Sequence, residues 1–229
     1  MLVLGIESST ALVSVAVVDD QKLRAEISLN GEQYSSRRLL PVISSLLEEA
    51  NLEFNELTGI AVSLGPGSFT SLRIGLATAK GLAHAGGKPL VGIPTLEGLA
   101  LNAVGVSGLI CPVLAARRQE VYTALYRWQE GELCGLTSYM VVEPSSWAAR
   151  LASYDEPVYF LGDAVMPYRE VWLSLGNRAV FLPPESTLPR GGHIARLGQR
   201  RLSQGQVDDL FQLKPLYLRP SAAEWKNRE

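Results

Sequence analysis

Two polar stretches of the sequence are candidates for a ligand site. Glu7 and Ser9 stand in a polar turn directly after an apolar run, and the glycine turn Gly65-Pro-Gly67 follows a second apolar run. A glycine turn that leads into a helix can present unpaired N–H groups to a phosphate, so Gly65 and Gly67 are candidates for an anion site. A carboxylate can hold the magnesium ion of a nucleotide, so Glu7 and Ser9 are counted with them as candidates for what remains of a nucleotide site.

The glycine turn also has an architectural explanation. A buried strand that sends a helix back across a sheet needs a sharp break, and Gly65, Pro66 and Gly67 would supply it without any ligand. The stretch lacks the Lys-Ser or Lys-Thr of a P-loop, and Thr70 stands where the dinucleotide motif has its third glycine. The sequence thus favours the architectural explanation over a phosphate site.

Few residues in the sequence are suited to bind a metal ion or to catalyse hydrolysis. The two histidines, His84 and His193, are far apart in the sequence, and Cys111 and Cys134 have no metal-ligand spacing. No Ser-His-Asp or Cys-His set is readable. We therefore expect no catalytic residue, no metal site and no cofactor.

The composition is typical of a folded globular protein. Of 229 residues, 47% are hydrophobic and 19% are charged, and the formal net charge is −2. This charge gives no global basic character for binding nucleic acid. No apolar run approaches the ~20 residues of a membrane span, and the first residues do not resemble a signal peptide. We expect a cytoplasmic protein without membrane contact.

Hydrophobic periodicity predicts the order β-β-β-α-β-α-β-α for a first domain, residues 1–105. Strands are expected at 2–6, 12–18, 22–29, 60–64 and 89–93, and helices at 35–51, 69–84 and 96–104. Ser35 or Ser36 could cap the first of these helices, and Ser68 or Thr70 the second.

Residues 106–229 are expected to form a second domain that also opens with a hairpin and a third strand. Strands are predicted at 110–116, 120–128, 133–142, 158–161 and 213–218, and helices at 145–151, between 163 and 173, and at 194–202. The final helix and the tail could instead pack back on the first domain.

Several motifs are distinctive. The longest are Leu2-Val-Leu-Gly-Ile-Glu-Ser-Ser-Thr10 and Gly65-Pro-Gly-Ser-Phe-Thr-Ser-Leu-Arg-Ile-Gly75, and shorter ones lie at 37–41, 117–122 and 215–219. Together they resemble the TsaB (YeaZ) family over essentially the whole chain. The resemblance implies an α/β fold of the actin, Hsp70 and sugar-kinase (ASKHA) type, with two domains of mixed β-sheets flanked by helices.

The resemblance also implies a role. TsaB proteins are taken to be non-catalytic partners of TsaD in the synthesis of threonylcarbamoyladenosine at position 37 of tRNA, a tRNA modification that also needs TsaE. The implied partners are therefore TsaD, TsaE through the TsaB–TsaD complex, and a second copy of the chain when it is alone. Contact with tRNA is expected to be indirect or weak.

The sequence departs from nucleotide-binding ASKHA proteins at both phosphate loops. Serines follow Glu7 where glycines are usual, and the second hairpin reads Ala115-Ala-Arg-Arg-Gln-Glu120 without the usual acid. A magnesium-bound triphosphate would find few ligands there. Gly191-Gly192 is interpreted as a helix start in preference to an adenosine loop. The alternative functions are an ATP-binding kinase or ATPase of this fold, and a homodimeric interaction protein with another partner.

The resemblance places the main partner contact on the first two long helices, which would pair with the matching helices of TsaD or of a second copy. Helix 35–51 has more apolar positions than one buried face requires, and helix 69–84 has small residues that permit close packing. The hypothesis assigns to the partner face a set from both helices: Leu39, Val42, Ile43, Leu46, Leu72, Leu76 and Lys80. The alternative is that most of these residues are core against the sheet.

Overall fold

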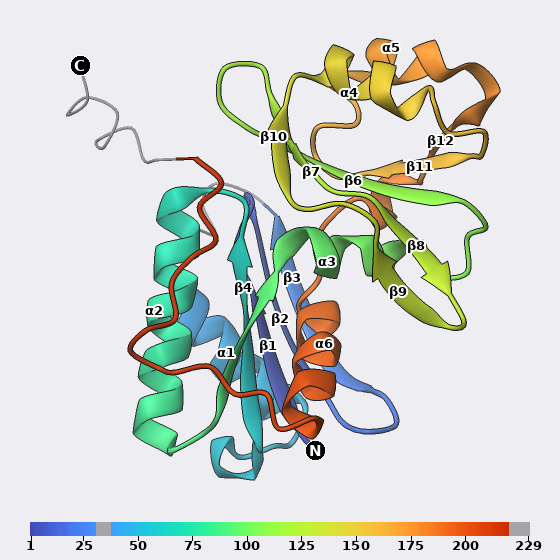
Figure 1. The fold of residues 1–229 in the computed structure, drawn as a ribbon. Coiled ribbons are helices and arrows are strands. Elements are labelled where there is room, and N and C mark those ends of the chain that lie inside the picture. The colour runs from blue at the N-terminus through green and yellow to red at the C-terminus, as the bar shows by residue number, and fades with distance from the viewer. Residues whose placement is uncertain (31–37, 220–229) are drawn as a thin grey trace, which may run out of the picture. The chain divides into compact units, whose positions relative to one another are not determined.

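The structure, a computed structural model, describes residues 1–30 and 38–219, which divide into two compact units (Figure 1). Unit 1 contains Met1–Gly98 and Pro189–Leu216, and unit 2 contains Leu99–Leu188 and the described tail from Tyr217. Each unit has a mixed sheet with helices, which confirms the predicted fold class. The domain boundary predicted at residue 105 stays a prediction.

Unit 1 is built on a sheet with the strand order β3-β2-β1-β4-β5. An antiparallel meander comprises β1 (Val3–Glu7), β2 (Leu12–Val18) and β3 (Leu23–Asn30). Two strands parallel to β1 extend it, β4 (Gly59–Gly65) and β5 (Leu90–Pro94). All five were predicted within a few residues. Because β1 and β4 are parallel neighbours, the turns that follow them adjoin at one end of the sheet.

Helices cover both faces of this sheet (Figure 1). One face carries α1 (Leu39–Glu49) and α2 (Phe69–Gly86), and the other carries α6 (Gly191–Ser203), which packs on β1, β2 and β4. A shorter helix, α3 (Thr95–Ala100), follows β5 directly. Ser68 is the N-cap of α2, whereas the predicted caps of the first helix, Ser35 and Ser36, lie outside the described residues.

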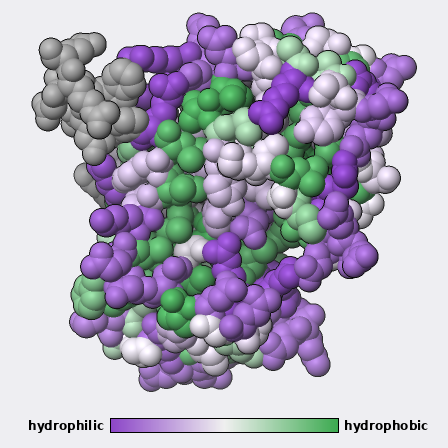
Figure 2. All heavy atoms as spheres, viewed as in Figure 1, coloured by the Kyte–Doolittle hydropathy of each residue, from purple (hydrophilic) through white to green (hydrophobic). Residues whose placement is uncertain are grey.

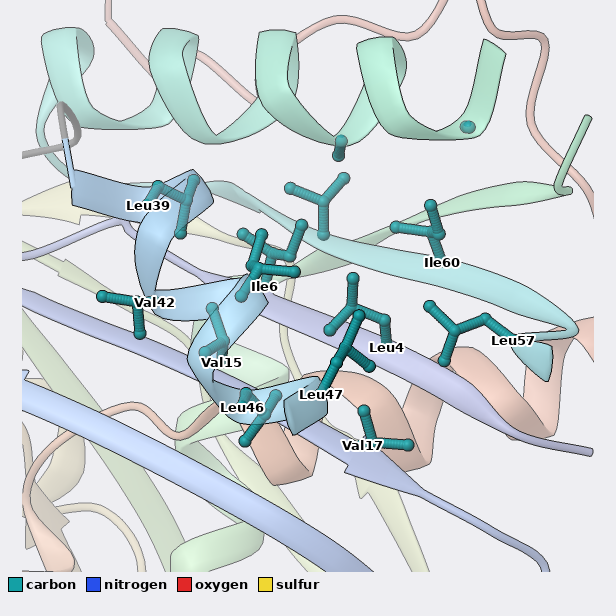
Figure 3. Close-up of a cluster of buried hydrophobic side chains, with 14 of the residues drawn as sticks. Leu4, Ile6, Val15, Val17, Leu39, Val42, Leu46, Leu47, Leu57 and Ile60 are labelled. Atoms are coloured by element: carbon teal, nitrogen blue, oxygen red, sulfur yellow. The ribbon is translucent and has the colours of Figure 1, made fainter. Parts of the chain in front are cut away.

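The main core of unit 1 lies between the sheet and the α1–α2 pair (Figure 3). Leu4 and Ile6 of β1 face the helices because alternate strand side chains point to the same side. Leu39 and Leu46 of α1 are fully buried against them, as expected for the apolar stripe of an amphipathic helix. On the opposite face a β-carbon at Gly5 would overlap the backbone of α6, so this glycine sets how closely α6 packs.

The segment after α6 runs along the edge strand β5 and then over α2. The Asp208 amide donates to the Leu90 carbonyl (2.9 Å), and the Asp208 carboxylate accepts from the Gly92 amide (2.8 Å). Further on, the Leu216 amide donates to Leu64 (2.8 Å). The strand predicted at 213–218 is wrong, because Pro215 has no N–H to donate and this single bond does not form a ladder.

Unit 2 has the strand order β10-β7-β6-β11-β12, and the β8–β9 hairpin joins at β6. Its strands are β6 (Leu109–Ala115), β7 (Val121–Thr123), β8 (Tyr126–Gln129), β9 (Glu132–Gly135), β10 (Met140–Val142), β11 (Val158–Leu161) and β12 (Ala179–Phe181). The helices α4 (Pro144–Leu151) and α5 (Arg169–Trp172) close a core around Trp147, Phe160 and Trp172.

The strands predicted at 120–128 and 133–142 are each divided in two. The division follows a change of partner, because both β7 and β8 pair with β6, but β7 has β10 on its other side whereas β8 has β9. Short 3₁₀ helices complete the described fold: η3 (Phe54–Glu56), η4 (Leu101–Ala103), η5 (Leu173–Arg178) and η6 (Pro184–Ser186). Among the helices of residues 1–30 and 38–219, none is long and apolar enough to cross a membrane.

Two helical glycines give a matched test of this packing. A β-carbon at Gly198 of α6 would overlap that of Ala61 on β4, whereas one at Gly81 of α2 meets nothing within 4 Å. Alanine improves helix propensity at both positions, by about 0.5–1 kcal/mol. We expect Gly81→Ala to raise the free energy of unfolding by this amount and Gly198→Ala to lower it by about 1–3 kcal/mol. Chemical denaturation measures both, and equal effects would contradict the described packing of α6.

Candidate functional site

The candidate residues near the chain start meet at the carboxyl ends of β1 and β4. The carbonyl oxygen of Ser9 accepts a hydrogen bond from the amide of Ser68, the N-cap of α2 (2.7 Å). The Ser8 hydroxyl donates to the Ser71 carbonyl in the first turn of α2 (3.1 Å). The polar turn after β1 and the glycine turn after β4 are therefore one structural feature, which we call the β1–α2 junction, residues 7–9 and 63–71.

Two glycines make this junction possible. A β-carbon at Gly67 would overlap the carbonyl group of Ser9, and a β-carbon at Gly75 would overlap the Ser8 hydroxyl oxygen. Gly65 has a φ of 103°, a conformation that favours glycine. These glycines bring the start of α2 against the turn after β1, in agreement with the architectural explanation.

Three backbone donors of the junction, the amides of Ser8, Ser9 and Ser68, are bonded within the chain. The Ser9 amide donates to Oε1 of Glu7 (2.5 Å), and the Ser8 amide donates to the Ser63 hydroxyl (3.3 Å). The Ser68 amide is used by Ser9. A phosphate at a helix start needs N–H groups that are directed at it. Here Oε1 of Glu7 is itself the acceptor of the Ser9 amide. Whether the junction is what remains of a nucleotide site stays a prediction.

Glu7 is fully buried in this junction. Burial raises the pKa of its carboxyl group to about 7, because a charged carboxylate loses its hydration. Hydrogen bonding within the turn, with the Ser9 amide as donor to Oε1, opposes this rise. Among the described residues, Oε2 has no hydrogen-bond partner. A buried oxygen without a partner is expensive when it is charged, so the neutral form of Glu7 is favoured in the fold.

Two amides at the start of α6 also have acceptors within the chain. The Gly191 amide donates to the Ser14 hydroxyl and the Gly192 amide to Oε1 of Glu26, both at 2.9 Å. Arg190 forms an ion pair with the same Glu26 carboxylate. Gly191-Gly192 therefore begins a helix that packs on the sheet, which is the interpretation that the sequence favoured. Burial, with the nearby Arg190, lowers the pKa of His193 to about 4.

The second hairpin lies in unit 2 and contacts an acid, Asp163, that the sequence analysis did not connect with it. The Ala115 amide donates to Asp163 Oδ1 (2.7 Å), and Glu120 forms an ion pair with Arg219. Burial raises the pKa of the Asp163 carboxyl group. Asp163 follows Gly162 directly after β11, and a Gly-Asp pair after a buried strand was the available signal. The Ala115 amide of this hairpin therefore already has an acceptor within the chain, the carboxylate of Asp163.

Metal ligands do not gather anywhere in the described part of the chain. Within residues 1–30 and 38–219, no group of three or more His, Cys, Asp or Glu side chains is placed to hold a metal ion. His84 is exposed on α2, where its ring meets Phe211 edge-on, and Cys111 is buried against Trp147. These contacts are structural.

The residues assigned to the partner face lie mostly inside unit 1. The six apolar ones have exposed fractions between 0% and 8%: Leu39, Val42, Ile43, Leu46, Leu72 and Leu76. Lys80 is half-buried, and its ammonium group donates to the Phe211 carbonyl (3.4 Å). The six apolar side chains are thus buried in the single chain, and whether any of them contributes to a partner contact stays a prediction. That the two helices bind a partner stays a prediction, and it now concerns their exposed sides.

The exposed sides of α1 and α2 carry different residues. Leu40 on α1 is 54% exposed, and α2 exposes Arg73, Ala77 and Gly81 at helical spacing. Figure 2 shows hydrophilic residues separating the hydrophobic ones over the side of unit 1 in view. We call Leu40, Arg73, Ala77 and Gly81 the exposed helix face. Its small residues permit a neighbouring backbone to approach closely.

Comparison with known proteins identifies the family. The chain is 33% identical to "tRNA threonylcarbamoyladenosine biosynthesis protein TsaB" of Bacillus subtilis over 227 residues, which cover 99% of this chain and 97% of the relative. The chain belongs to the TsaB (YeaZ) family. Residues 24–225 also match the sequence model of the family described as "TsaD: tRNA N6-adenosine threonylcarbamoyltransferase".

Solved structures agree with this family membership. YeaZ from Pseudomonas aeruginosa superimposes with a TM-score of 0.82 at 28% identity, covering 95% of this chain and 99% of that one. The ROK hexokinase from Thermus thermophilus has a TM-score of 0.51 at 14% identity, covering 90% of this chain and all of that one. The second likeness shows the fold alone, and it confirms the ASKHA type.

The buried carboxyl group of Glu7 predicts an unusual dependence of stability on pH. Its pKa is higher in the folded chain than the ordinary 4.5, so the folded chain holds this proton more tightly. The corresponding stabilisation is complete below pH 4.5 and is lost as pH rises to about 7. His193 acts in the opposite sense, because its lowered pKa costs stability as pH falls from 6.5 to 4.

Comparison with Glu7→Gln separates these two effects. Glutamine keeps an acceptor oxygen for the Ser9 amide but has no charge. Relative to the unsubstituted chain, we expect its free energy of unfolding to rise with pH between 4.5 and 7, by up to about 3 kcal/mol. Urea denaturation at several pH values measures this difference, and a difference independent of pH would contradict the raised pKa of Glu7.

Proposed function

We propose that this chain is a non-catalytic subunit required for the threonylcarbamoyladenosine modification at position 37 of tRNA. In this role it acts in the cytoplasm, binds a TsaD-type subunit and supports it together with TsaE. The observation that carries the proposal is the full-length similarity to a protein named for threonylcarbamoyladenosine biosynthesis, TsaB of Bacillus subtilis.

The internal bonding of both loops supports a role without catalysis. In unit 1 the amides of Ser8, Ser9 and Ser68 have acceptors within the chain. In unit 2 the Ala115 amide has Asp163 as its acceptor. These groups would have to exchange their partners before they could hold a triphosphate. An ATP-binding kinase or ATPase of the same fold is therefore less well supported than a binding subunit.

The similarity to the TsaD family supports the choice of partner. The match to the TsaD sequence model extends over residues 24–225, so a TsaD-type subunit would have helices equivalent to α1 and α2. Related chains can pair equivalent surfaces about a two-fold or pseudo-two-fold axis, as identical chains do in isologous dimers. The same surface would serve a second copy of this chain when TsaD is absent.

The exposed helix face is the surface that we assign to this contact. Ala77 and Gly81 have little or no side chain, so a partner helix could approach the α2 backbone. Leu40 adds an exposed apolar side chain on α1, and Arg73 adds a charge. The buried Leu39, Val42, Ile43, Leu46, Leu72 and Leu76 hold the two helices on the sheet behind this face.

A single large side chain on the exposed helix face tests the assignment. In Ala77→Arg a long charged side chain would stand where the partner helix approaches. We expect the affinity for the TsaD-type subunit to fall at least ~30-fold, since disrupting a central contact commonly costs ≥ ~2 kcal/mol. The binding is measured by calorimetry with the TsaD protein of the same source.

The matched control is Ala149→Arg. Ala149 is also an exposed alanine on a helix, α4 of unit 2, so the added charge and volume are the same. Its affinity should equal that of the unsubstituted chain. Loss of binding in both variants, or in neither, would refute the assignment to α2.

Nucleotide binding by the isolated chain separates the proposal from its alternative. We expect no heat of binding when magnesium-ATP is titrated into the chain, because the amides of Ser8, Ser9 and Ser68 already have acceptors within it. A kinase or ATPase would instead bind it with micromolar affinity typical of an enzyme substrate. Such binding would favour the alternative function over a non-catalytic subunit.

A further inference from the structure

We infer that Glu7 is a positioning residue whose proton determines how firmly the start of α2 is held. The inference stands apart from the proposed function, because it concerns an equilibrium within the isolated chain. It rests on a line of hydrogen bonds that joins the carboxyl group to the helix, and on the complete burial of that group.

The hydrogen bonds lead from Glu7 to α2 in two steps. Oε1 of Glu7 accepts the Ser9 amide (2.5 Å), which fixes the orientation of the turn after β1. The Ser9 carbonyl then accepts the Ser68 amide (2.7 Å), and the Ser68 carbonyl accepts the Leu72 amide as the first bond of α2 (2.9 Å). Ser68 makes no side-chain cap, and the Ser9 carbonyl accepts the amide of this N-cap residue itself.

A charge on Glu7 therefore acts at the point where α2 begins. When the carboxyl group is neutral, its burial costs little and the Ser9 amide keeps an acceptor. When it is ionised, the negative charge is fully buried and Oε2 has no partner among the described residues. Relief requires opening of the turn to water, and opening of the turn breaks the Ser9–Ser68 bond. Opening of the turn would also displace α2, because the backbone of Gly67 and of Gly75 packs directly on Ser9 and Ser8, with no side chain between them.

The charged groups on the surrounding elements are engaged elsewhere. Glu7 pairs with Ser14 on β2, and Ser14 in turn contacts Glu26 of β3, which is bound to Arg190 at the start of α6. Beyond β5, Glu97 is paired with Arg201.

Two further titratable or charged groups complete this environment. His193 follows Arg190 on α6, and Arg73 stands exposed on α2. The pKa of Glu7 is raised by burial and lowered only by hydrogen bonding within the β1–α2 junction. Glu7 is therefore governed by its own desolvation rather than by a partner charge.

The test is hydrogen exchange of single amides in the full chain, followed by NMR between pH 5 and pH 8. The amides of Ser9 and Ser68 report on the junction. The Thr58 amide, which donates to Leu2 at the opposite end of the same strands (2.7 Å), reports on unit 1 as a whole. Protection factors, which are corrected for intrinsic exchange, give the equilibrium between closed and open forms.

We expect the protection of the Ser9 and Ser68 amides to fall about tenfold for each pH unit between pH 5 and pH 7, and to level off above pH 7. Global unfolding also exposes Glu7, so the protection of Thr58 should fall with pH as well, but it should stay well above that of Ser9 and Ser68 at every pH. Equal protection of all three amides at every pH would assign the proton to global unfolding alone and would overturn the positioning role. Protection of Ser9 and Ser68 that is independent of pH would overturn it as well.

Two variants make the assignment to Glu7 specific. Glu7→Gln should remove the pH dependence at Ser9 and Ser68, whereas Glu26→Gln, which changes another carboxylate that accepts a backbone amide, should leave it. Retention of the dependence in Glu7→Gln would refute the inference. If Glu7→Gln does not fold, the ¹³C shift of the Glu7 carboxyl carbon in the unsubstituted chain decides, because its titration must coincide with the loss of protection.

Discussion

The amide of Ser68 donates to the carbonyl of Ser9, and this bond joins the turn after β1 to the start of α2. Gly67 lacks the side chain that would prevent it, and Glu7 holds Ser9 in place from inside. The remainder of unit 1 depends on this approach. With its start fixed, α2 lies along β4 and closes the core over β1 together with α1 (Figure 3).

The same bond gives the start of α2 an acceptor within the protein. A helix start attracts anions because its first amides lack partners. In this chain the Ser9 carbonyl accepts the Ser68 amide at α2, and Ser14 and Glu26 accept the Gly191 and Gly192 amides at α6. These contacts stabilise the fold, and they agree with the proposed role as a non-catalytic subunit.

Much of the fold could be predicted from the sequence, but less of the site could. β1, β2 and β4 are apolar runs bounded by polar or glycine turns, so local pattern is enough to find them. The apolar stripe of α1 shows that Leu39 and Leu46 pack on something, but periodicity does not show whether the sheet or a partner covers them. The contact of Asp163 with Ala115 joins residues 48 positions apart, and no local pattern contains it.

The most direct measurement for the central claim is a reconstitution of tRNA modification. TsaD of the same source, TsaE, tRNA and a supply of threonylcarbamoyl-adenylate are combined with and without this chain, and the modified base is quantified. The account predicts that the modified base forms only when the chain is present. Equal formation of the modified base in its absence would contradict the role as a required subunit.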